Sequence, residues 1–237
     1  MNNLYLRPGT FDQYIFKSIV NHNEYEMTPD LVKDKVILDI GAHIGSFAFL
    51  CLSMGAKKVY AFEPDPDNFF ALKQNMSKNF DEDRFELHNE AVWRSDDDAE
   101  DIPYSGYFDN TGGGNVLFGK SNLYDRTDSY LVPTVPFDKV LSEIEEKIDL
   151  LKLDCEFSEF PILLTSKKFN DITHVIGEFH EIGGEYNPEL TIPEHAKVGN
   201  YEKYTINDLE GYFENLGYEF QHKRTMKHLG IFKATKI

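Results

Sequence analysis

Two acids and two glycines near the start of the chain have the residue types and spacing of a nucleotide site. Asp39 lies in the apolar run 36–40, and the turn after that run, Ile-Gly-Ala-His-Ile-Gly, contains Gly41 and Gly45. Glu63 follows directly after the next apolar run, Lys-Val-Tyr-Ala-Phe. Short apolar runs rich in β-branched residues are typical of buried strands. The backbone N–H groups of a strand–turn–helix unit point into one crevice, and an acid ending the second strand accepts hydrogen bonds from a ribose diol.

The turn differs from a dinucleotide fingerprint. The pattern Gly-x-Gly-x-x-Gly aims a helix N-terminus at a pyrophosphate, but here position 43 is a histidine and Asp39 stands before the turn. A carboxylate at this place repels a pyrophosphate and suits a ligand that carries an ammonium group. Together with Glu63 at the ribose, this pattern predicts a site for S-adenosylmethionine (SAM). The alternative is a turn whose glycines serve packing only.

The composition excludes several classes of protein. Lys and Arg number 24 and Asp and Glu number 41, so the net charge is −17. Nucleic acids and anionic membrane surfaces both bind basic surfaces, so neither is an expected partner. The two cysteines, Cys51 and Cys155, are too few for a disulfide framework, and neither a membrane span nor a signal peptide is recognisable. We therefore expect a cytoplasmic α/β protein with one main domain.

The apolar pattern predicts strands that alternate with helices. Strands are expected at 36–40, 58–62, 84–93, 148–154 and 174–179, with an antiparallel pair at 218–222 and 229–233 and an edge strand at 131–135 interrupted by Pro133. Helices are expected at 11–21, 44–54, 64–79, 136–146, 160–168 and 205–216. Residues 1–34 are interpreted as an N-terminal helical cap and 35–237 as the SAM-binding domain, with an inserted acidic and Gly-rich loop region at about 94–130.

The ends of the strands are where ligands are expected. In an open parallel sheet, ligands bind beyond the carboxyl ends of the strands. Asn89 and Ala91, at the end of the third strand, should therefore flank the adenine, whereas Trp93 is expected to fill the core. The loop Asn-Thr-Gly-Gly-Gly-Asn at 110–115 lacks the Lys-Ser/Thr of a phosphate-binding loop. It is therefore either a mobile loop that faces the second substrate or an ordinary long turn.

This layout, with its final antiparallel pair, is that of class I SAM-dependent methyltransferases. Three segments narrow the resemblance, namely 36–47 (Val-Ile-Leu-Asp-Ile-Gly-Ala-His-Ile-Gly-Ser-Phe), 59–66 (Val-Tyr-Ala-Phe-Glu-Pro-Asp-Pro) with Asn68, and 148–156 (Ile-Asp-Leu-Leu-Lys-Leu-Asp-Cys-Glu) with Glu159. Together they resemble the FkbM family, which methylates hydroxyl groups on polyketides, sugars and related small molecules. The resemblance covers roughly residues 25–181, and it departs from the family pattern at Phe157, where a glycine is usual.

The resemblance implies a fold and a set of site residues. The fold is Rossmann-like, with a mostly parallel seven-stranded sheet, an antiparallel last strand and helices on both faces. The cofactor is SAM, and the partner is a small-molecule hydroxyl acceptor. The implied cofactor-binding residues are Asp39, Gly41, Ala42, His43 and Gly45 around the methionine portion, Glu63 and Pro64 at the ribose, Asn89 and Ala91 at the adenine, and Asp154 beside the sulfonium.

Methyl transfer to a hydroxyl requires alignment of the acceptor and removal of its proton. The candidates are Asp154, Glu156, Glu178 and His180, which follow or end the strands 148–154 and 174–179. Asp154, Glu178 and His180 are expected to be catalytic, and His180 is the best base by intrinsic pKa. Such a group also suits Mg²⁺ or Mn²⁺. No two of these acids have a recognised ligand spacing, so the sequence favours a metal-free route and no metal site is expected.

Two other functions are compatible with the same pattern. An aminopropyl transferase on this fold would use the acidic loops to hold a polyamine, but the segment 148–156 matches methyltransferases better. A non-catalytic interaction protein of this fold need not keep Asp39, Gly41, Gly45 and Glu63. Calorimetry with SAM separates the non-catalytic alternative from the enzymes.

Overall fold

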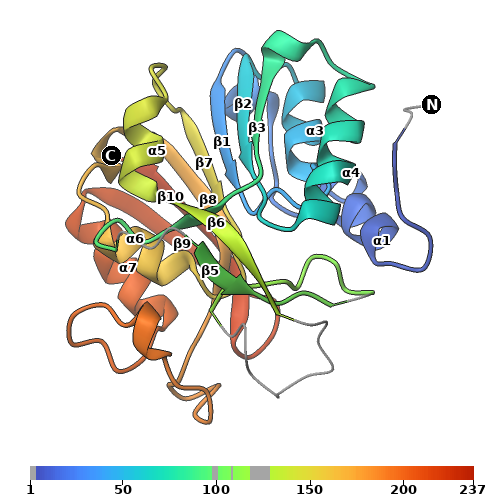
Figure 1. The fold of residues 1–237 in the computed structure, drawn as a ribbon. Coiled ribbons are helices and arrows are strands. Elements are labelled where there is room, and N and C mark those ends of the chain that lie inside the picture. The colour runs from blue at the N-terminus through green and yellow to red at the C-terminus, as the bar shows by residue number, and fades with distance from the viewer. Residues whose placement is uncertain (1–3, 98–100, 108, 118–128) are drawn as a thin grey trace.

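A seven-stranded sheet runs through the centre of the molecule (Figure 1). The computed structural model describes residues 4–97, 101–107, 109–117 and 129–237. The strand order in the large sheet is β3-β2-β1-β7-β8-β10-β9. These strands are β1 (Val36–Ile40), β2 (Lys58–Phe62), β3 (Phe85–His88), β7 (Leu150–Leu153), β8 (His174–His180), β9 (Tyr218–Arg224) and β10 (Leu229–Lys236). Every residue of the central strands β1 and β7 is buried, as expected for strands covered on both faces.

The pairing confirms the predicted topology. Neighbouring strands from β3 to β8 are parallel. The last strand of the chain, β10, lies between β8 and β9 and is antiparallel to both. The carboxyl ends of β1, β2, β7 and β8 therefore meet at one edge of the sheet, where a ligand is expected in such a fold.

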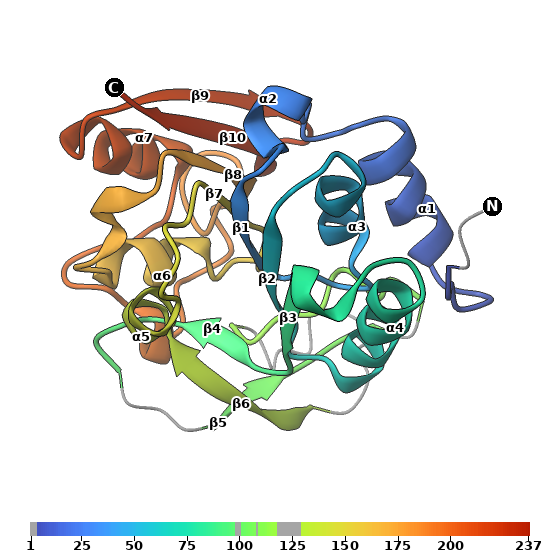
Figure 2. The same cartoon turned by 90° about the horizontal axis from the view of Figure 1, so that it is seen from above.

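Helices cover both faces of the sheet (Figure 2). One face carries α1 (Asp12–Phe16), α3 (Ser46–Ser53) and α4 (Pro66–Ser77), and the other carries α5 (Phe137–Glu143), α6 (Glu159–Thr165) and α7 (Ile206–Asn215). Shorter helical segments are η1 (Lys17–Asn21), α2 (Pro29–Val32), η2 (Glu82–Arg84), η3 (Phe169–Asp171) and η4 (Glu194–Ala196). Asp65 begins α4 by accepting hydrogen bonds from the backbone N–H groups of Asp67 and Asn68, both at 2.9 Å.

A second sheet corrects two predictions. It has three strands in the order β4-β6-β5, with β4 at Ala91–Trp93, β5 at Asp101–Tyr104 and β6 at Tyr130–Pro136. The predicted strand 84–93 is therefore wrong, because the chain leaves β3 after His88 and enters β4 in the other sheet. The predicted strand at 131–135 is present as β6, but its predicted place at an edge is wrong, because β6 lies between β4 and β5. Pro133 is accepted there because only β5 pairs at its position, while β4 pairs with 134–136.

The break between β3 and β4 has a local cause. The Asn89 side-chain amide donates to the backbone oxygens of Glu63 and Pro64, at 2.8 and 3.0 Å, and so ties the turn to the end of β2. The following segment directs Trp93 into the core, where it is 1% exposed, as predicted.

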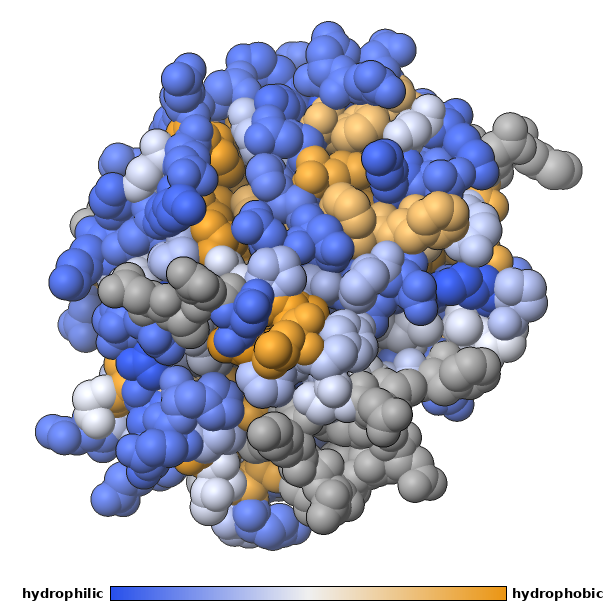
Figure 3. All heavy atoms as spheres, in the orientation of Figure 1, coloured by the Kyte–Doolittle hydropathy of each residue, from blue (hydrophilic) through white to orange (hydrophobic). Residues whose placement is uncertain are grey.

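The face of the molecule seen in the orientation of Figure 1 is largely hydrophilic. The face in Figure 3 is covered mainly by hydrophilic side chains, with separate apolar patches between them. Within the described part of the chain, no helix has the length and apolar character needed to cross a bilayer. Parts of the predicted 94–130 loop region lie outside the described residues, including positions 98–100, 108 and 118–128.

Candidate active site

A cavity of about 560 Å³ opens at the carboxyl ends of the central strands. Its walls come from the β1–α3 turn, the end of β2, the segment 90–92, the Gly-rich loop 110–116 and the ends of β7 and β8. This size is usual for a pocket that holds a small-molecule ligand. Segments far apart in the sequence therefore meet at one site.

The β1–α3 turn depends on Gly41. Its φ is +76°, and a Cβ at this position would lie 1.8 Å from the backbone oxygen of Asp154. Glycine is needed here for the close approach of two strand ends as well as for the backbone angle. Because the neighbour is the protein backbone, Gly41 first serves the assembly of the site.

Glu63 is buried directly after β2, and both of its carboxylate oxygens accept hydrogen bonds from the protein. Its Oε2 accepts from the backbone N–H of His43 at 2.8 Å, and its Oε1 accepts from the backbone N–H of Asp65 at 2.9 Å. Burial and the charge of Asp65 raise the pKa of Glu63 to about 7. Oε1 also accepts from the Asn68 side-chain amide at 3.3 Å, so the lone pair that Glu63 can still offer to a ligand is the second one of Oε2.

Asp39 does not line the cavity and lies beneath it. It is 0% exposed, and its Oδ1 is 3.3 Å from Lys152 Nζ. Lys152 lines the cavity, donates to the backbone oxygen of Gly41 at 2.6 Å and lies 3.7 Å from Asp154 Oδ2. Burial alone would lower the pKa of Lys152, but Asp39 and Asp154 raise it above its ordinary value. Asp39 thus holds a buried cation under the strand ends in this structure.

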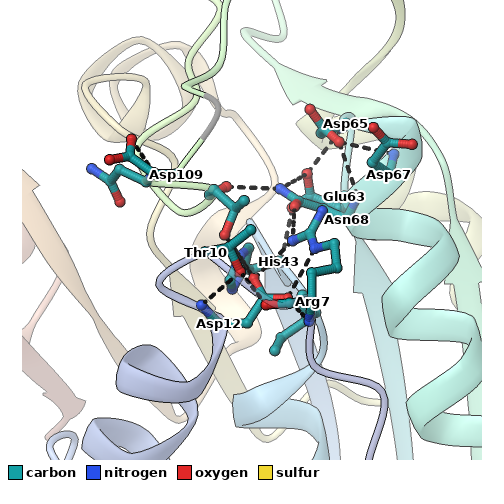
Figure 4. Close-up of polar contacts among 12 residues, drawn as sticks. Arg7, Thr10, Asp12, His43, Glu63, Asp65, Asp67, Asn68 and Asp109 are labelled. Atoms are coloured by element: carbon teal, nitrogen blue, oxygen red, sulfur yellow. Dashed lines mark hydrogen bonds and ion pairs between the residues drawn. The ribbon is translucent and has the colours of Figure 1, made fainter.

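A hydrogen-bonded network closes one side of the cavity (Figure 4). Asp12 binds Arg7 through two side-chain bonds of 2.9 Å and accepts from Thr111 Oγ1 at 2.8 Å. Thr111 Oγ1 also lies 2.8 Å from His43 Nε2, and Asn68 joins Arg7 to the backbone oxygen of Thr111. Burial lowers the pKa of His43 to about 4, so its imidazole is neutral at neutral pH. The N-terminal segment, the β1–α3 turn and the Gly-rich loop are thereby joined.

The Gly-rich loop itself is a wall of the cavity. Its residues 112–114 line the space, and a Cβ on Gly114 would lie 1.8 Å from the hydroxyl of the buried Tyr104. Of the two interpretations of this loop, the placement agrees with a loop that faces the site.

The predicted catalytic residues are brought together at the ends of β7 and β8. Asp154, Glu178 and His180 all line the cavity, and one oxygen or nitrogen atom from each lies within 4.8 Å of the others. The buried Tyr25 hydroxyl donates to Asp154 Oδ2 at 2.9 Å. Burial and the charge of Asp154 raise the pKa of Glu178 well above its ordinary value.

His180 is surrounded by carboxylates. Its Nδ1 is 3.1 Å from Glu159 Oε1, and its Nε2 lies 3.5 Å from Glu156 Oε2 and 3.6 Å from Glu178 Oε2. Burial alone would lower the pKa of His180, but these carboxylates raise it well above its ordinary value. The raised pKa favours the doubly protonated imidazolium form of His180. This form has no free nitrogen lone pair, which argues against the general-base role expected from the intrinsic pKa.

Phe157 occupies the position where the family pattern has glycine, and its backbone adopts a left-handed conformation that favours glycine. Its φ is +80°, and Glu156 before it has φ 48°. The Phe157 ring lines the cavity and packs 5.1 Å from the His180 ring. The departure from glycine therefore adds an aromatic ring to the cavity wall.

Most predicted site residues meet at the cavity. Those that line it are Gly41, Ala42, His43, Glu63, Pro64, Ala91, Asp154, Glu178 and His180. Asp39, Gly45 and Asn89 do not line it. A Cβ on Gly45 would lie 2.6 Å from Leu72 Cδ1, so this glycine serves the packing of α3 on α4. Sequence reasoning missed the contacts that Lys152, Tyr25 and Asp12 make at the site. Of these residues, only Lys152 could have been found from the sequence, because a lysine inside an apolar strand indicates a buried charge with a partner.

Comparisons with known proteins agree with this architecture. A sequence profile for the methyltransferase FkbM domain matches residues 39–220. The ribosomal protein L11 methyltransferase of Acinetobacter baumannii (strain AYE) is 46% identical over 48 residues, which are 20% of this chain and 16% of that protein. Its counterpart in Psychrobacter sp. (strain PRwf-1) is 40% identical over 53 residues, which are 22% and 17%. The solved methyltransferase FkbM from Methylobacillus flagellatus KT has a TM-score of 0.53 at 14% identity, over 92% of this chain and 47% of that chain.

The strand order and the cavity at the strand ends define a class I methyltransferase fold. Because the profile covers most of the chain, from 39 to 220, the chain belongs to the FkbM methyltransferase family. The matches span only about a sixth of these two curated relatives and less than half of the solved FkbM protein.

Proposed function

We propose that this protein is a SAM-dependent methyltransferase that transfers a methyl group to a hydroxyl of a small molecule. The observation that carries the proposal is the single cavity that has Glu63 and the Gly41–His43 turn on one wall and the Asp154, Glu178 and His180 side chains on another. One wall suits a nucleoside and the other suits a reacting polar group. Membership of the FkbM family supports the same function.

The residues of the cavity fit SAM. Glu63 lies where a ribose diol is bound in this class of fold. Apolar side chains suited to an adenine line the neighbouring wall, namely Phe62, Ala91, Val92 and Val116. The buried Ser46 hydroxyl at the start of α3 also lines the cavity and has no hydrogen-bond partner in the described part of the chain. An unpartnered buried hydroxyl at a cavity wall favours a ligand that bonds to it.

SAM supplies an electrophilic methyl group on a sulfonium, so the protein has only to position the acceptor and manage a proton. In our proposal, Asp154 lies beside the reacting centre, held by Tyr25 and Lys152. Glu178 and His180 orient the acceptor hydroxyl at the same end of the cavity. Gly41, Ala42 and His43 shape the opposite end, and the surrounding walls exclude water.

A small acceptor agrees with the charge of the molecule. The net charge of −17 disfavours an anionic polymer, and the acidic wall at β7 and β8 has the same effect inside the cavity. We expect a neutral or cationic alcohol to enter more easily than a phosphorylated one.

The test is methyl transfer from isotope-labelled SAM to a panel of sugars and polyketide-like alcohols. The expected product is a methyl ether, which survives mild alkali, whereas a methyl ester is hydrolysed to methanol. Asp154→Asn should lower the turnover about 10²-fold or more, because a small misplacement of the reacting groups has an effect of that size. Label found only in added RNA or protein, or only in esters, would contradict the proposed acceptor.

A further inference from the structure

Three side chains at the ends of β7 and β8 form a group of ligand atoms. One atom each from Asp154, Glu178 and His180 lies within 4.8 Å of the other two. Atoms that share one ion at about 2.2 Å lie roughly 3–4.4 Å apart. His180 Nε2 and Glu178 Oε2 are already 3.6 Å apart. Small side-chain movements therefore suffice to bring all three atoms to binding distance.

A second carboxylate orients the imidazole. Glu159 is 0% exposed, and its Oε1 lies 3.1 Å from His180 Nδ1 and accepts from the backbone N–H of Cys155 at 2.9 Å. A histidine that binds a metal usually donates its other ring N–H to such a carboxylate. The bond to Glu159 occupies Nδ1 and leaves Nε2 facing the carboxylates of Glu178 and Glu156.

Asp154 is oriented in a similar way. The Tyr25 hydroxyl and Lys152 Nζ contact the same oxygen, Oδ2, at 2.9 and 3.7 Å. Lys152 is also bound to Asp39 and to a backbone oxygen, so its charge is shared. Four carboxylates, those of Asp154, Glu156, Glu159 and Glu178, thus surround one imidazole, and a cation would relieve their repulsion.

An independent observation at the same wall points to a ligand. The Ser158 side chain is 1% exposed, lines the cavity and has no hydrogen-bond partner for its hydroxyl within the described ranges. Buried hydroxyl groups are normally paired with protein or ordered water. Water bound to a cation in the cavity supplies such a partner.

We infer that Asp154, Glu178 and His180 bind one divalent cation, with Mn²⁺ preferred over Mg²⁺. Binding displaces the proton from His180 Nε2 to solvent, since a nitrogen that ligates a metal must give up its proton. One imidazole with two carboxylates suits Mn²⁺, whereas Mg²⁺ prefers oxygen ligands. The sequence favours a metal-free route because the three ligands come from two different strands and therefore show no recognised ligand spacing along the chain.

The role of the cation in catalysis rests on the proposed function. The cation binds the acceptor hydroxyl and lowers its pKa. The Glu156 carboxylate lines the same cavity and lies 3.5 Å from His180 Nε2. It would take the hydroxyl proton as the acceptor oxygen forms its bond to the methyl carbon. The sulfur–carbon bond breaks with its electron pair left on sulfur.

The test titrates Mn²⁺ into the EDTA-stripped full chain and follows the paramagnetic resonance signal of free Mn²⁺. One Mn²⁺ per chain should bind, and the affinity should fall at least tenfold in Asp154→Asn and in His180→Gln. Glu90→Gln removes a carboxylate from another wall of the same cavity and should leave the affinity unchanged. Electron spin echo spectra of bound Mn²⁺ should show imidazole nitrogen coupling that is absent in His180→Gln.

Weak binding of several ions, unaffected by these substitutions, would mean association with the acidic surface and would overturn the inference. The absence of nitrogen coupling in the wild type would overturn it as well. Circular dichroism of each variant controls for folding. Binding of S-adenosylhomocysteine to the wild type is measured separately. If the wild type binds Mn²⁺ but does not bind S-adenosylhomocysteine, the proposed function is contradicted and the metal site is not.

Discussion

At the scale of single residues, Gly41 shows how one missing side chain supports the site. Its Cβ position lies 1.8 Å from the Asp154 backbone oxygen, whereas Gly217, at φ +79°, has no atom within 4 Å. Gly41→Ala should lower the free energy of unfolding by about 1–3 kcal/mol more than Gly217→Ala, because only the first overpacks two strand ends. Urea unfolding of both variants measures the difference. Equal losses would mean that only the backbone angle matters at Gly41.

His43 should make stability depend on pH. Its pKa is about 4 in the folded protein and about 6.5 in the unfolded chain, so the unfolded state binds more protons between these values. The stabilisation by neutral His43 is complete above pH 6.5 and is lost as the pH falls toward 4, by about 3 kcal/mol in total.

The check compares the wild type with His43→Gln at pH 7.5, 5.5 and 4.5. The stability advantage of the wild type should shrink as the pH falls, and comparison with the variant cancels the titration of Glu63, which is common to both. Parallel pH profiles would contradict the assigned environment of His43.

Residue types at the site were largely predictable, but their partners were not. Glu63, Asp154 and His180 were predicted because polar residues that end apolar runs meet at one sheet edge. The pairing of Asp39 with Lys152 depends on the register of β1 and β7, in which these two residues are opposite each other. No local pattern in the sequence reports that register, so Asp39 was assigned to the ligand instead.

At the scale of elements, the turn between β7 and α6 carries strain at Phe157. Its φ of +80° costs a non-glycine residue about 1–2 kcal/mol. Phe157→Gly should be more stable than Phe157→Ala by about 0.5–1 kcal/mol. Both variants lose the ring, but only glycine relieves the backbone strain. The more flexible unfolded chain of the glycine variant offsets about 0.4–1 kcal/mol of that gain.

Thermal or urea unfolding of the two variants measures this difference. A more stable alanine variant would show that the turn changes its course once the ring is removed.

The elements of the large sheet followed from periodicity, since its strands are short apolar runs between turn signals. The split of 84–93 did not, because Asn89 interrupts the run through hydrogen bonds to Glu63 and Pro64, which are remote in sequence. The central position of β6 was missed for a related reason. A proline within a strand indicates an edge strand. The sequence does not show that β4 pairs with β6 only beyond Pro133 and so leaves one side of this residue unpaired.

At the scale of the whole molecule, the Asp12 network joins the N-terminal segment to the cavity. Asp12 is 0% exposed, and its bonds to Arg7 help to lower its pKa to about 2 although burial acts in the opposite direction. Asp12→Asn should cost about 3 kcal/mol, because it leaves the Arg7 charge without its partner. Asp30→Asn, at an exposed acid of the same segment, should cost almost nothing.

Hydrogen exchange locates the effect. In Asp12→Asn the amides of residues 4–16 and 109–117 should exchange faster, while those of β1 keep their protection. Uniform acceleration across the sheet would show that the network stabilises the whole fold instead of one side of the cavity.

The central claim is that the cavity binds SAM with its ribose at Glu63. The most direct test is titration calorimetry with S-adenosylhomocysteine at pH 8, where Glu63, with its pKa of about 7, is ionised. The wild type should bind one molecule per chain, and Glu63→Ala should bind at least about tenfold more weakly, since a hydrogen bond to a charged group contributes about 1.5–3 kcal/mol. The absence of saturable binding in the wild type, or unchanged affinity in a folded Glu63→Ala variant, would contradict the claim.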